Sequence, residues 1–473
     1  MIALSLADVA AIVGGQQHDI PDPGLTVTGP VVIDSREVRP GSLFAAFAGE
    51  HVDGHDFAER AVAAGAAAVL ASRPVGVPAV VVDDVVAALG KLARAVVERL
   101  GTTVVALTGS AGKTSTKDLV AQLLTGIGPT VWTPGSLNNE IGLPLTALRA
   151  DAGTRHLVLE MGARGIGHIR YLTELTPPRI GVVLNVGTAH LGEFGGREQI
   201  AQAKGELVES LPGEADGGIA VLNADDPLVR AMSARTKART VLFGEAADAH
   251  VRAEDVRLDA LGRPSFTLHT PTGCGNVTMR LYGEHHVSNA LAAAAVAHEL
   301  GMPVSEIASA LSGAGQLSRW RMEVTERADG VTIVNDAYNA NPESMRAALR
   351  ALVAMGEAAQ ARGGRTWAVL GRMAELGEES LAEHDAVGRL AVRLNVSKLV
   401  AVGGREAAWL RMGAYNEGSW GEESVHVSDA QAAVDLLRSE LRPGDVVLVK
   451  ASRSVGLERV AEQLLALDGE VAG

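Results

Sequence analysis

The sequence predicts an α/β protein of three domains, of which the second and third are built on mostly parallel, doubly wound sheets. Its 473 residues correspond to three domains of ~150 residues each. From residue 101 onwards, apolar strand-like runs alternate with amphipathic helical patterns, which is typical of βαβ units. A hydrophobic content of 47% with 21% charged residues allows each domain to bury a large core.

Residues 1–100 are expected to form a small α/β domain. The strand-like runs VVIDSR (31–36) and PAVVVDD (78–84) lie on either side of an alanine-rich helix at about 56–68, and a helix at about 85–99 closes the segment. The start, MIALSLADVAAIVGG, lacks the basic residues of a signal peptide, so we expect a short amphipathic helix there.

Residues 101–317 are expected to form the central domain. The patterns predict, in chain order, a strand at 103–109, a helix at 113–124, a strand at 156–162, a helix at 167–175, a strand at 179–187, a helix at 198–211 and a strand at 218–226. A β-rich insertion follows at about 240–281, and a helix is predicted at 286–300.

Residues 318–473 are expected to form a Rossmann-like, doubly wound domain. Its strands are predicted at 331–337, 365–371, 398–404 and 445–451. Each is followed by a helical pattern, as a parallel sheet requires.

Composition narrows the class of protein. The formal net charge of −14 argues against a non-specific nucleic-acid binder and against docking on an anionic membrane. No window reaches ~18 uninterrupted apolar residues, so no membrane insertion is predicted. The single cysteine, Cys274, excludes a disulfide framework within the chain and argues against a cysteine-based metal site. We expect a cytoplasmic protein, and a monomer is the working assumption.

The stretch VVALTGSAGKTSTKDL (104–119) has the order of a phosphate-binding loop: a buried strand, a glycine-rich turn, a Lys-Thr pair and a helix. Backbone N–H groups and the helix N-terminus would face a phosphate, Lys113 would neutralise it, and the Thr114 hydroxyl would ligate Mg²⁺. The general pattern G-x-x-x-x-G-K-[ST] has glycine where this chain has Leu107, so a plain strand–helix turn is the alternative. Lys117, one turn further, either touches the nucleotide or faces solvent.

Three further residues suggest chemistry at the ends of strands. Glu160 lies at the C-terminal end of one predicted strand and His190 follows another in the same sheet as the loop, where ligand groups gather. Taken alone, each is more often a solvated or structural residue than a metal ligand. Lys204 lies on a predicted helix, where a lysine usually faces solvent. Only seven of the 42 basic residues are lysines, which favours a role for the retained ones in amine chemistry that arginine cannot perform.

Two asparagine-rich stretches complete the candidates. Asn138 and Asn139 stand between turn-forming residues, where they either shape a turn or hold phosphate or metal-bound water. In NDAYNANP (335–342), several polar side chains follow a strand and precede a helix, which suits a polar ligand or an Asx-rich turn with a cap. These side chains are Asp336, Tyr338, Asn339 and Asn341.

Taken together, these residues resemble the Mur ligases of bacterial cell-wall synthesis. The resemblance covers nearly the whole chain, in an ordered series of stretches: IDSREVRPGSLFAAFAGEHVDGHDF, LTGSAGKTSTKD, SLNNEIGLPLTAL, LEMGARGIGHI, NVGTAHLGEFG, AKGELVESL, GEHHVSNALAAAA, SRWRMEV, NDAYNANPESM, LGRMAELG and VKASRSVGLE. The family loop is the shorter T-G-[ST]-x-G-K-[ST], so Leu107 is no defect within it. DAYNANP and the ELG stretch favour the dipeptide-adding member.

The resemblance implies a site for each substrate. Its ATP-binding residues are Gly109, Ser110, Ala111, Gly112, Lys113, Thr114, Ser115, Asn289, Arg321 and Asp336. Its magnesium ligands are Thr114, Glu160, His190 and Lys204, the last as a carbamate formed with CO₂. Its catalytic residues are Lys113, Lys204 and His190. The UDP-substrate would contact Ser35, Arg36 and Phe47, and D-alanyl-D-alanine would contact Tyr338, Asn339 and Asn341.

The implied reaction joins the carboxylate of UDP-N-acetylmuramoyl-tripeptide to the amine of D-alanyl-D-alanine through an acyl phosphate made from ATP, with Mg²⁺. It implies closure of the third domain, with hinges near Leu317 and at Leu100 as a second candidate. One departure stands out: the family reads L-G-D-M-x-E-L-G, and this chain has Arg372 at the acidic position.

Three rival functions stay open at this point. They are another acid–amine ligase of the same fold (another Mur-type enzyme or a folylpolyglutamate synthetase), a phosphate-loop kinase, and a nucleotide-gated binding protein.

Overall fold

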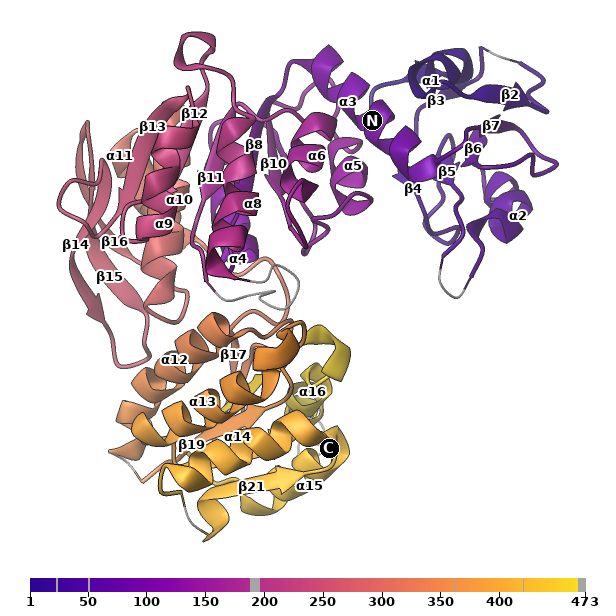
Figure 1. Cartoon of the computed structure of the whole chain (residues 1–473). Helices are drawn as coiled ribbons and strands as arrows, with labels where there is room; N and C mark the ends of the chain where they lie inside the picture. The colour runs from indigo at the N-terminus through magenta and orange to yellow at the C-terminus, as the bar shows by residue number, and fades with distance from the viewer. Residues whose placement is uncertain (23, 50–51, 188–195, 362, 420, 467–473) are drawn as a thin grey trace.

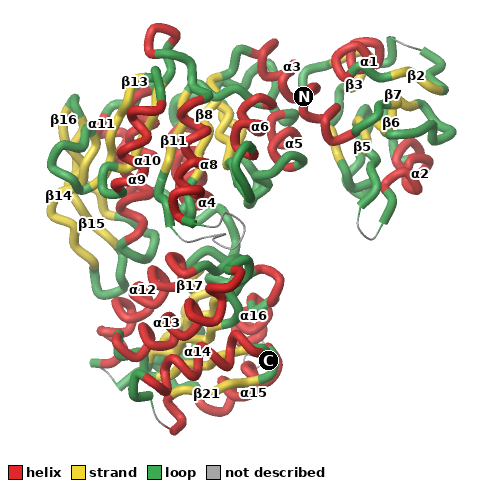
Figure 2. Tube along the Cα trace, in the orientation of Figure 1, coloured by secondary structure: helices red, strands yellow, loops and turns green. Residues whose placement is uncertain are grey.

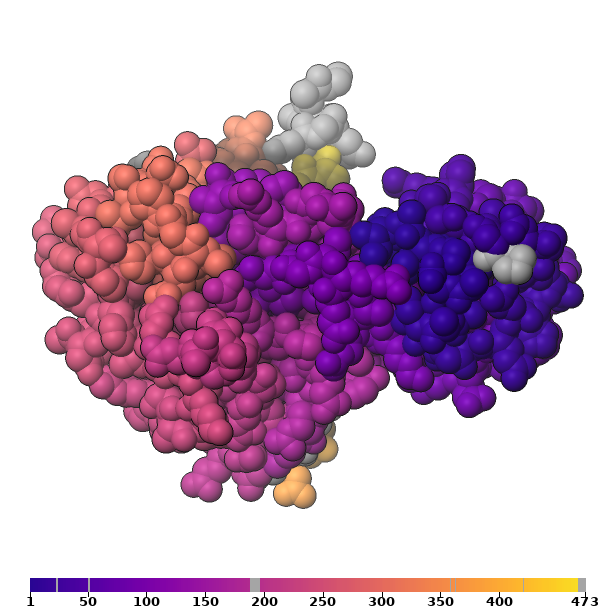
Figure 3. Space-filling model, turned by 90° about the horizontal axis from the view of Figure 1, so that it is seen from above, coloured from indigo at the N-terminus to yellow at the C-terminus, as the bar shows by residue number. Residues whose placement is uncertain are grey.

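The computed structural model describes residues 1–22, 24–49, 52–187, 196–361, 363–419 and 421–466. Its strands form three large sheets, which belong to three bodies (Figure 1). The N-terminal and C-terminal bodies both adjoin the central one and lie on different sides of it. Viewed from above, the N-terminal body projects from one side of the molecule (Figure 3).

The N-terminal sheet has the order β2-β7-β6-β5-β4, and β2 alone runs antiparallel to its neighbour. Its strands are β2 (Gln16–His18), β4 (Val31–Val32), β5 (Leu43–Ala45), β6 (Ala68–Ala71) and β7 (Ala79–Val81). A separate antiparallel pair joins β1 (Leu4–Ser5) and β3 (Thr26–Val27). The helices are α1 (Leu6–Val13), the 3₁₀ helix η1 (Gly54–Phe57), α2 (Ala58–Ala63) and α3 (Val85–Leu100).

One expectation for this region is wrong. The alanine-rich helix predicted over 56–68 ends at Ala63, and its last predicted residue, Ala68, begins strand β6 instead. Gly65, with φ of 106°, turns the chain in the left-handed region that favours glycine. Residues 68–71 are buried throughout, as in a strand covered on both faces of a parallel sheet. Burial therefore overrides the helical propensity of alanine. The strand predicted at 31–36 is limited to Val31–Val32.

The central sheet has nine strands in the order β16-β15-β14-β13-β12-β11-β8-β10-β9, parallel from β9 to β14. They are β8 (Thr103–Thr108), β9 (Thr130–Trp132), β10 (His156–Glu160), β11 (Ile180–Val183), β12 (Ile219–Asn223), β13 (Arg239–Gly244), β14 (Val251–Leu258), β15 (Pro264–Thr270) and β16 (Gly273–Thr278). The helices are α4 (Lys113–Thr125), α5 (Gly142–Ala147), α6 (His168–Leu175), α8 (Arg197–Glu209), α9 (Pro227–Arg230), α10 (His285–Glu299) and α11 (Val304–Gly313), with 3₁₀ turns η2 (Glu214–Asp216) and η3 (Ala231–Arg235).

Helices cover both faces of this sheet (Figure 2). Helices α4, α10 and α11 share one hydrophobic core with it. On the other face, α5, α6, α8 and α9 share a second core, which continues through α3 into α1 of the N-terminal body. Since this second core runs across Leu100 without a break, the first two bodies are joined by packed side chains as well as by the chain.

The C-terminal sheet has the order β17-β18-β22-β19-β20-β21, parallel except for β17. Its strands are β17 (Glu323–Glu326), β18 (Thr332–Asn335), β19 (Thr366–Leu370), β20 (Lys398–Val402), β21 (Ser424–Val427) and β22 (Val446–Lys450). One face is covered by α12 (Pro342–Gln360), α13 (Ser380–Arg393) and α14 (Arg405–Asn416), and the other by α15 (Ala430–Glu440) and α16 (Glu458–Ala466). This is the doubly wound arrangement expected from the sequence. Short 3₁₀ turns are η4 (Gly377–Glu379), η5 (Gly421–Glu423) and η6 (Arg453–Val455).

None of the helices in the described ranges combines the length and the apolarity that crossing a membrane requires.

Candidate active site

The phosphate loop follows β8, as predicted. Gly109 to Gly112 form the turn, and α4 begins at Lys113. Gly112 has φ of 80°, and a Cβ built there would lie 2.6 Å from the Asn289 Oδ1 atom. Glycine is therefore required at this position by the backbone angle and by the close approach of α10.

Asn185, which follows β11, braces this loop from behind. Its Oδ1 accepts hydrogen bonds from the N–H groups of Ser110 (3.0 Å) and Ala111 (2.8 Å). Its Nδ2 donates to the Ala111 carbonyl at 3.1 Å. Sequence reasoning missed Asn185, although it lies in the stretch NVGTAHLGEFG that carried the resemblance. Its position after the strand next to β8 was the available signal.

Lys113 turns back over the loop, where its Nζ donates to the Gly109 carbonyl at 2.8 Å. Burial lowers the pKa of Lys113, the nearby Arg321 lowers it further, and Glu160 raises it. A phosphate placed at the loop would supply the negative charge that this buried ammonium lacks.

Glu160 ends β10 beside the loop and is 1% exposed. Its Oε2 accepts a hydrogen bond from Thr114 Oγ1 at 2.9 Å, and its Oε1 accepts one from Asn138 Nδ2 at 2.7 Å. Mg²⁺ prefers octahedral oxygen ligands at about 2.0–2.1 Å, which places neighbouring ligands about 2.8–3.0 Å apart. The spacing of Thr114 Oγ1 and Glu160 Oε2 therefore suits two neighbouring ligands of that ion.

Lys204, on α8, lines the same cleft and is 3% exposed. Burial, with a smaller effect from the charge of Lys113, holds the pKa of Lys204 well below its usual range. Its surroundings therefore favour the neutral, nucleophilic form of the amine more than water does. His190, the third predicted metal ligand, lies outside the described residues. Within the described ranges, no group of three or more His, Cys, Asp or Glu side chains is arranged to hold a metal.

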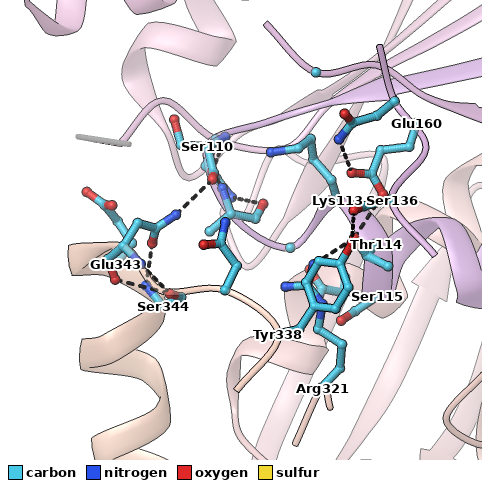
Figure 4. A pocket seen from close by; sticks show the side chains of 18 of the residues that line it. Ser110, Lys113, Thr114, Ser115, Ser136, Glu160, Arg321, Tyr338, Glu343 and Ser344 are labelled. Carbon is cyan, nitrogen blue, oxygen red and sulfur yellow. Dashed lines mark hydrogen bonds between the residues drawn. The ribbon is translucent and has the colours of Figure 1, made fainter. Parts of the chain in front are cut away.

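The C-terminal body reaches the phosphate loop through two stacked side chains (Figure 4). Arg321 Nη2 donates to Thr114 Oγ1 at 3.1 Å, and its guanidinium lies 4.3 Å from the centre of the Tyr338 ring. The Tyr338 hydroxyl forms a short hydrogen bond with Ser136 Oγ. Trp320 and Met322, on either side of Arg321, have φ of 58° and 53°. Bulky side chains are rare in this backbone region, so the strand entry holding Arg321 is strained.

Asn341 makes a third contact between the two bodies. Its Nδ2 donates to the Ser110 carbonyl at 3.2 Å, and its Oδ1 caps α12 by accepting from the Ser344 N–H. Asn339 is held through its backbone, because its carbonyl accepts from Lys450 Nζ at 2.9 Å. The same ammonium lies 2.6 Å from Asp336 Oδ2. All these residues line the cleft.

A buried polar wall forms the far side of the cleft. Asn289 Oδ1 accepts from Thr116 Oγ1 at 3.1 Å, while its Nδ2 is buried and finds no acceptor in the part of the chain that is described. His285 and His286 lie beside it, with ring centres 4.4 Å apart. Burial lowers the pKa of His285 to about 4 and that of His286 well below its usual value. A polar, neutral ligand such as a nucleobase suits these groups. Neither histidine was singled out from the sequence.

The cleft has a volume of about 530 Å³, within the usual range for a small-molecule site. Nine of the ten residues predicted to bind ATP line it, together with Glu160 and Lys204. Those that line it directly are Ser110, Ala111, Gly112, Lys113, Thr114, Ser115, Asn289, Arg321 and Asp336. Gly109 does not line it, but its carbonyl holds Lys113.

The residues predicted for the UDP-substrate lie elsewhere, in the N-terminal body. Ser35 is buried, Phe47 packs against the shared core, and the Arg36 side chain is 77% exposed and 2.6 Å from Asp34. They are not among the residues that line the cleft. Arg372 is also outside the lining. It is exposed and donates to Ser454 Oγ at 3.3 Å.

Fold and site together define a phosphate-loop enzyme of three α/β bodies, with a nucleotide cleft between the second and third. The chain belongs to the Mur ligase family. Three family models match it: "Mur ligase family, catalytic domain" at residues 30–100, "Mur ligase middle domain" at 107–297, and "Mur ligase, glutamate ligase domain" at 320–453.

Similar proteins match this chain over nearly its whole length. The UDP-N-acetylmuramoyl-tripeptide–D-alanyl-D-alanine ligase of Mycobacterium tuberculosis (strain ATCC 25618 / H37Rv) is 52% identical over 99% of both chains. A crystal structure of MurF from Acinetobacter baumannii superposes with a TM-score of 0.87 at 31% identity, covering 98% of this chain and 99% of that one. MurF ligase from Thermotoga maritima in complex with ADP gives 0.80 at 33% identity, covering 94% and 99%.

Proposed function

We propose that this protein is an ATP-dependent ligase that adds D-alanyl-D-alanine to UDP-N-acetylmuramoyl-tripeptide in peptidoglycan precursor synthesis. The observation that carries the proposal is the grouping of a phosphate loop, a buried Thr114–Glu160 oxygen pair and the buried amine of Lys204 in one cleft. Binding a nucleotide alone does not require such an amine. The names of the full-length relatives supply the substrates.

The chemistry has two steps. The tripeptide carboxylate attacks the γ-phosphorus of ATP, and the bond to the β-phosphate oxygen breaks to release ADP and leave an acyl phosphate. The dipeptide amine then attacks the acyl carbon, loses a proton, and expels phosphate from the tetrahedral intermediate. Lys113 and the loop N–H groups would balance charge on the transferring phosphoryl group. Arg321 would hold the nucleotide from the third body, beside Asp336 for the ribose and Asn289 for the base.

Mg²⁺, when bound, would neutralise phosphate charge as a Lewis acid. Thr114 Oγ1 and Glu160 Oε2 are its proposed ligands, with His190 as a further candidate. A neutral Lys204 amine can attack CO₂ and lose a proton to give a carbamate. This would exchange a buried amine beside Lys113 for an anionic oxygen ligand, which a second Mg²⁺ prefers.

The remaining assignments concern the other two substrates and the domains. We propose that residues 1–100, 101–317 and 318–473 act as the UDP-substrate, ATP and ligase domains. Ser35, Arg36 and Phe47 are the candidates for the uridine nucleotide. Tyr338, Asn339 and Asn341 remain the candidates for D-alanyl-D-alanine, which would exchange with the contacts that Tyr338 and Asn341 make to the central body.

A single incubation tests the function. The protein is mixed with ATP, Mg²⁺, UDP-N-acetylmuramoyl-tripeptide and D-alanyl-D-alanine, and the products are analysed by mass spectrometry and a phosphate assay. We expect a UDP-pentapeptide and one free phosphate per peptide bond, and neither from Lys113→Ala. A product that carries the phosphoryl group would indicate a kinase. Ligation only of a single amino acid would indicate another ligase of the fold, and no turnover would indicate a binding protein.

A further inference from the structure

Lys117 occupies an unusual place for a helical lysine. It lies one turn beyond Lys113 on α4 and is 1% exposed, so it does not face solvent. Its Nζ donates to the carbonyls of Thr133 (2.8 Å) and Gly135 (2.9 Å) and lies 2.8 Å from Asp118 Oδ1. An ammonium has three N–H donors, and the two carbonyls accept from two of them. The neighbouring Asp118 carboxylate balances its charge as an ion pair.

The carbonyls that Lys117 holds belong to a segment with two contacts in the cleft. We call residues 133–139, which follow β9, the bridging segment. Ser136 in this segment bonds the hydroxyl of Tyr338 from the C-terminal body. Asn138 donates to Glu160 Oε1 at 2.7 Å, and its carbonyl accepts from the Gly162 N–H at 2.9 Å. Figure 4 shows Ser136 and Glu160 on the same side of the cleft as Thr114.

The bridging segment is an irregular connection, because β9 ends at Trp132 and α5 begins at Gly142. Within it, Leu137 N–H donates to the Pro134 carbonyl at 3.3 Å, a weak turn contact. The Lys117 ammonium supplies two stronger, charge-assisted bonds to its first half. Removing that ammonium would leave two carbonyls without their hydrogen-bond donor and the Asp118 carboxylate without its counter-charge, all in a buried place.

We propose that Lys117 is a positioning residue for the reaction: it fixes the bridging segment to the phosphate-loop helix, so that Asn138 orients Glu160 and Ser136 receives Tyr338. Through this lysine, the bridging segment, Glu160 and Tyr338 are all connected to one rigid element, α4. This placement follows from contacts alone, whereas its effect on turnover rests on the proposed ligase function.

Hydrogen exchange in the full-length protein tests the placement without substrates. Lys117→Met keeps an unbranched apolar side chain as far as the ε position and removes the ammonium with its donors. We expect peptides covering residues 133–139 to exchange about tenfold faster or more, because the segment opens more often, while peptides from β12 stay unchanged. The matched control is Lys91→Met, which removes an exposed lysine of α3 that donates to the Val13 carbonyl at 3.4 Å. Unchanged exchange at 133–139 in Lys117→Met would overturn the proposal.

Ligation kinetics test the consequence. Lys117→Met is expected to raise the Mg²⁺ concentration for half-maximal activity and to lower kcat about 10- to 100-fold, as is usual when the support of a metal ligand is lost. Calorimetric binding of ADP should weaken more with Mg²⁺ than without it. Since Lys117 acts through Asn138, Lys117→Met should cost much less in an Asn138→Ala background. Independent, multiplicative losses would contradict the proposal.

Lys117→Arg serves if Lys117→Met does not fold. Its charge can still pair with Asp118, but a planar guanidinium cannot match the three directions of an ammonium. We expect this variant to fold. Exchange at 133–139 should be faster and the Mg²⁺ requirement higher than in the wild-type protein, but both changes should be smaller than in Lys117→Met. Wild-type exchange and Mg²⁺ dependence in this variant would overturn the proposal. If the wild-type protein shows no ligation at all, the proposed function is refuted, but the hydrogen-exchange result still tests the placement of Lys117.

Discussion

Lys113 and Lys204 are two buried amines in one cleft, and their neighbours separate their roles. Lys113 lies on the phosphate loop, with Glu160 near enough to favour its charged form. Lys204 has burial and the charge of Lys113 acting together against its own charge. The first is therefore suited to bind an anion, and the second to react as a neutral amine.

Substitution of Lys204 tests the carbamate directly. Lys204→Ala and Lys204→Arg should each lose about 100-fold or more in kcat, since neither can form a carbamate and the metal loses an anionic ligand. A small carboxylate added to Lys204→Ala should restore part of the rate by occupying the vacated space, and should do nothing for Lys204→Arg. Steady-state ligation assays provide the measurement. A fully active Lys204→Arg enzyme would contradict the proposal that Lys204 forms a carbamate.

At the scale of elements, the junction of β8, the phosphate loop and α4 depends on one backbone conformation. Gly112 has a positive φ and nearly touches Asn289 of α10. This one residue therefore sets both the direction of α4 and the position of the side chain assigned to the base.

Gly112→Ala should weaken ADP binding at least about tenfold and destabilise the fold by about 1–2 kcal/mol, the usual cost of a left-handed alanine. Calorimetry and thermal unfolding measure the two effects. Gly14→Ala is the matched control, because Gly14 has φ of 72° and a Cβ there would meet nothing within 4 Å. It should show the stability loss with normal ADP affinity. Equal ADP affinities in the two variants would remove Gly112 from the site.

At the scale of the whole molecule, four histidines with lowered pKa values make stability depend on pH. Burial lowers the pKa values of His156, His285, His286 and His384 below their usual 6.5. Between each folded-state value and 6.5 the unfolded chain binds more protons, so stability is full above pH 6.5 and is lost as the pH falls towards about 4, the pKa of His285.

The midpoint temperature of thermal unfolding should therefore decrease when the pH is lowered from 7 to 5. His156 is the best single contributor to examine, because it is distant in sequence from the cleft residues of α10 and neither ring nitrogen has a partner in the described part of the chain. His156→Leu should reduce the difference between the two midpoints, because it removes one of these groups. A midpoint that rises on acidification would contradict this assignment.

The proposed reaction also requires the three bodies to meet. The proposed uridine site lies in the N-terminal body, and the cleft lies between the other two. Because the core runs unbroken across Leu100, motion at that point would expose apolar side chains. Leu317 is 47% exposed and lies between α11 and β17, so we place the main hinge there. Small-angle scattering should show a smaller radius of gyration with an ATP analogue and UDP-tripeptide. Identical profiles would count against closure.

The sequence by itself determined the α/β class, the strand–loop–helix order around Lys113, and the placing of Glu160 at a strand end. These are local patterns, and parallel strands bring their carboxyl ends to one edge whatever their exact order. It also carried the resemblance to the Mur ligases. It misjudged α2, where alanine propensity yielded to burial in β6.

Only the tertiary structure decided which distant residues meet. Asn185 braces a loop about 75 positions away, and Arg321 reaches Thr114 across 207 positions. Lys117 is buried and not a surface residue, because the strand order sets β10 beside β8 and β9 beside β10, which brings the bridging segment over α4. Periodicity records which face of an element is buried, but it does not record what covers that face. That depends on strand order and on packing between bodies.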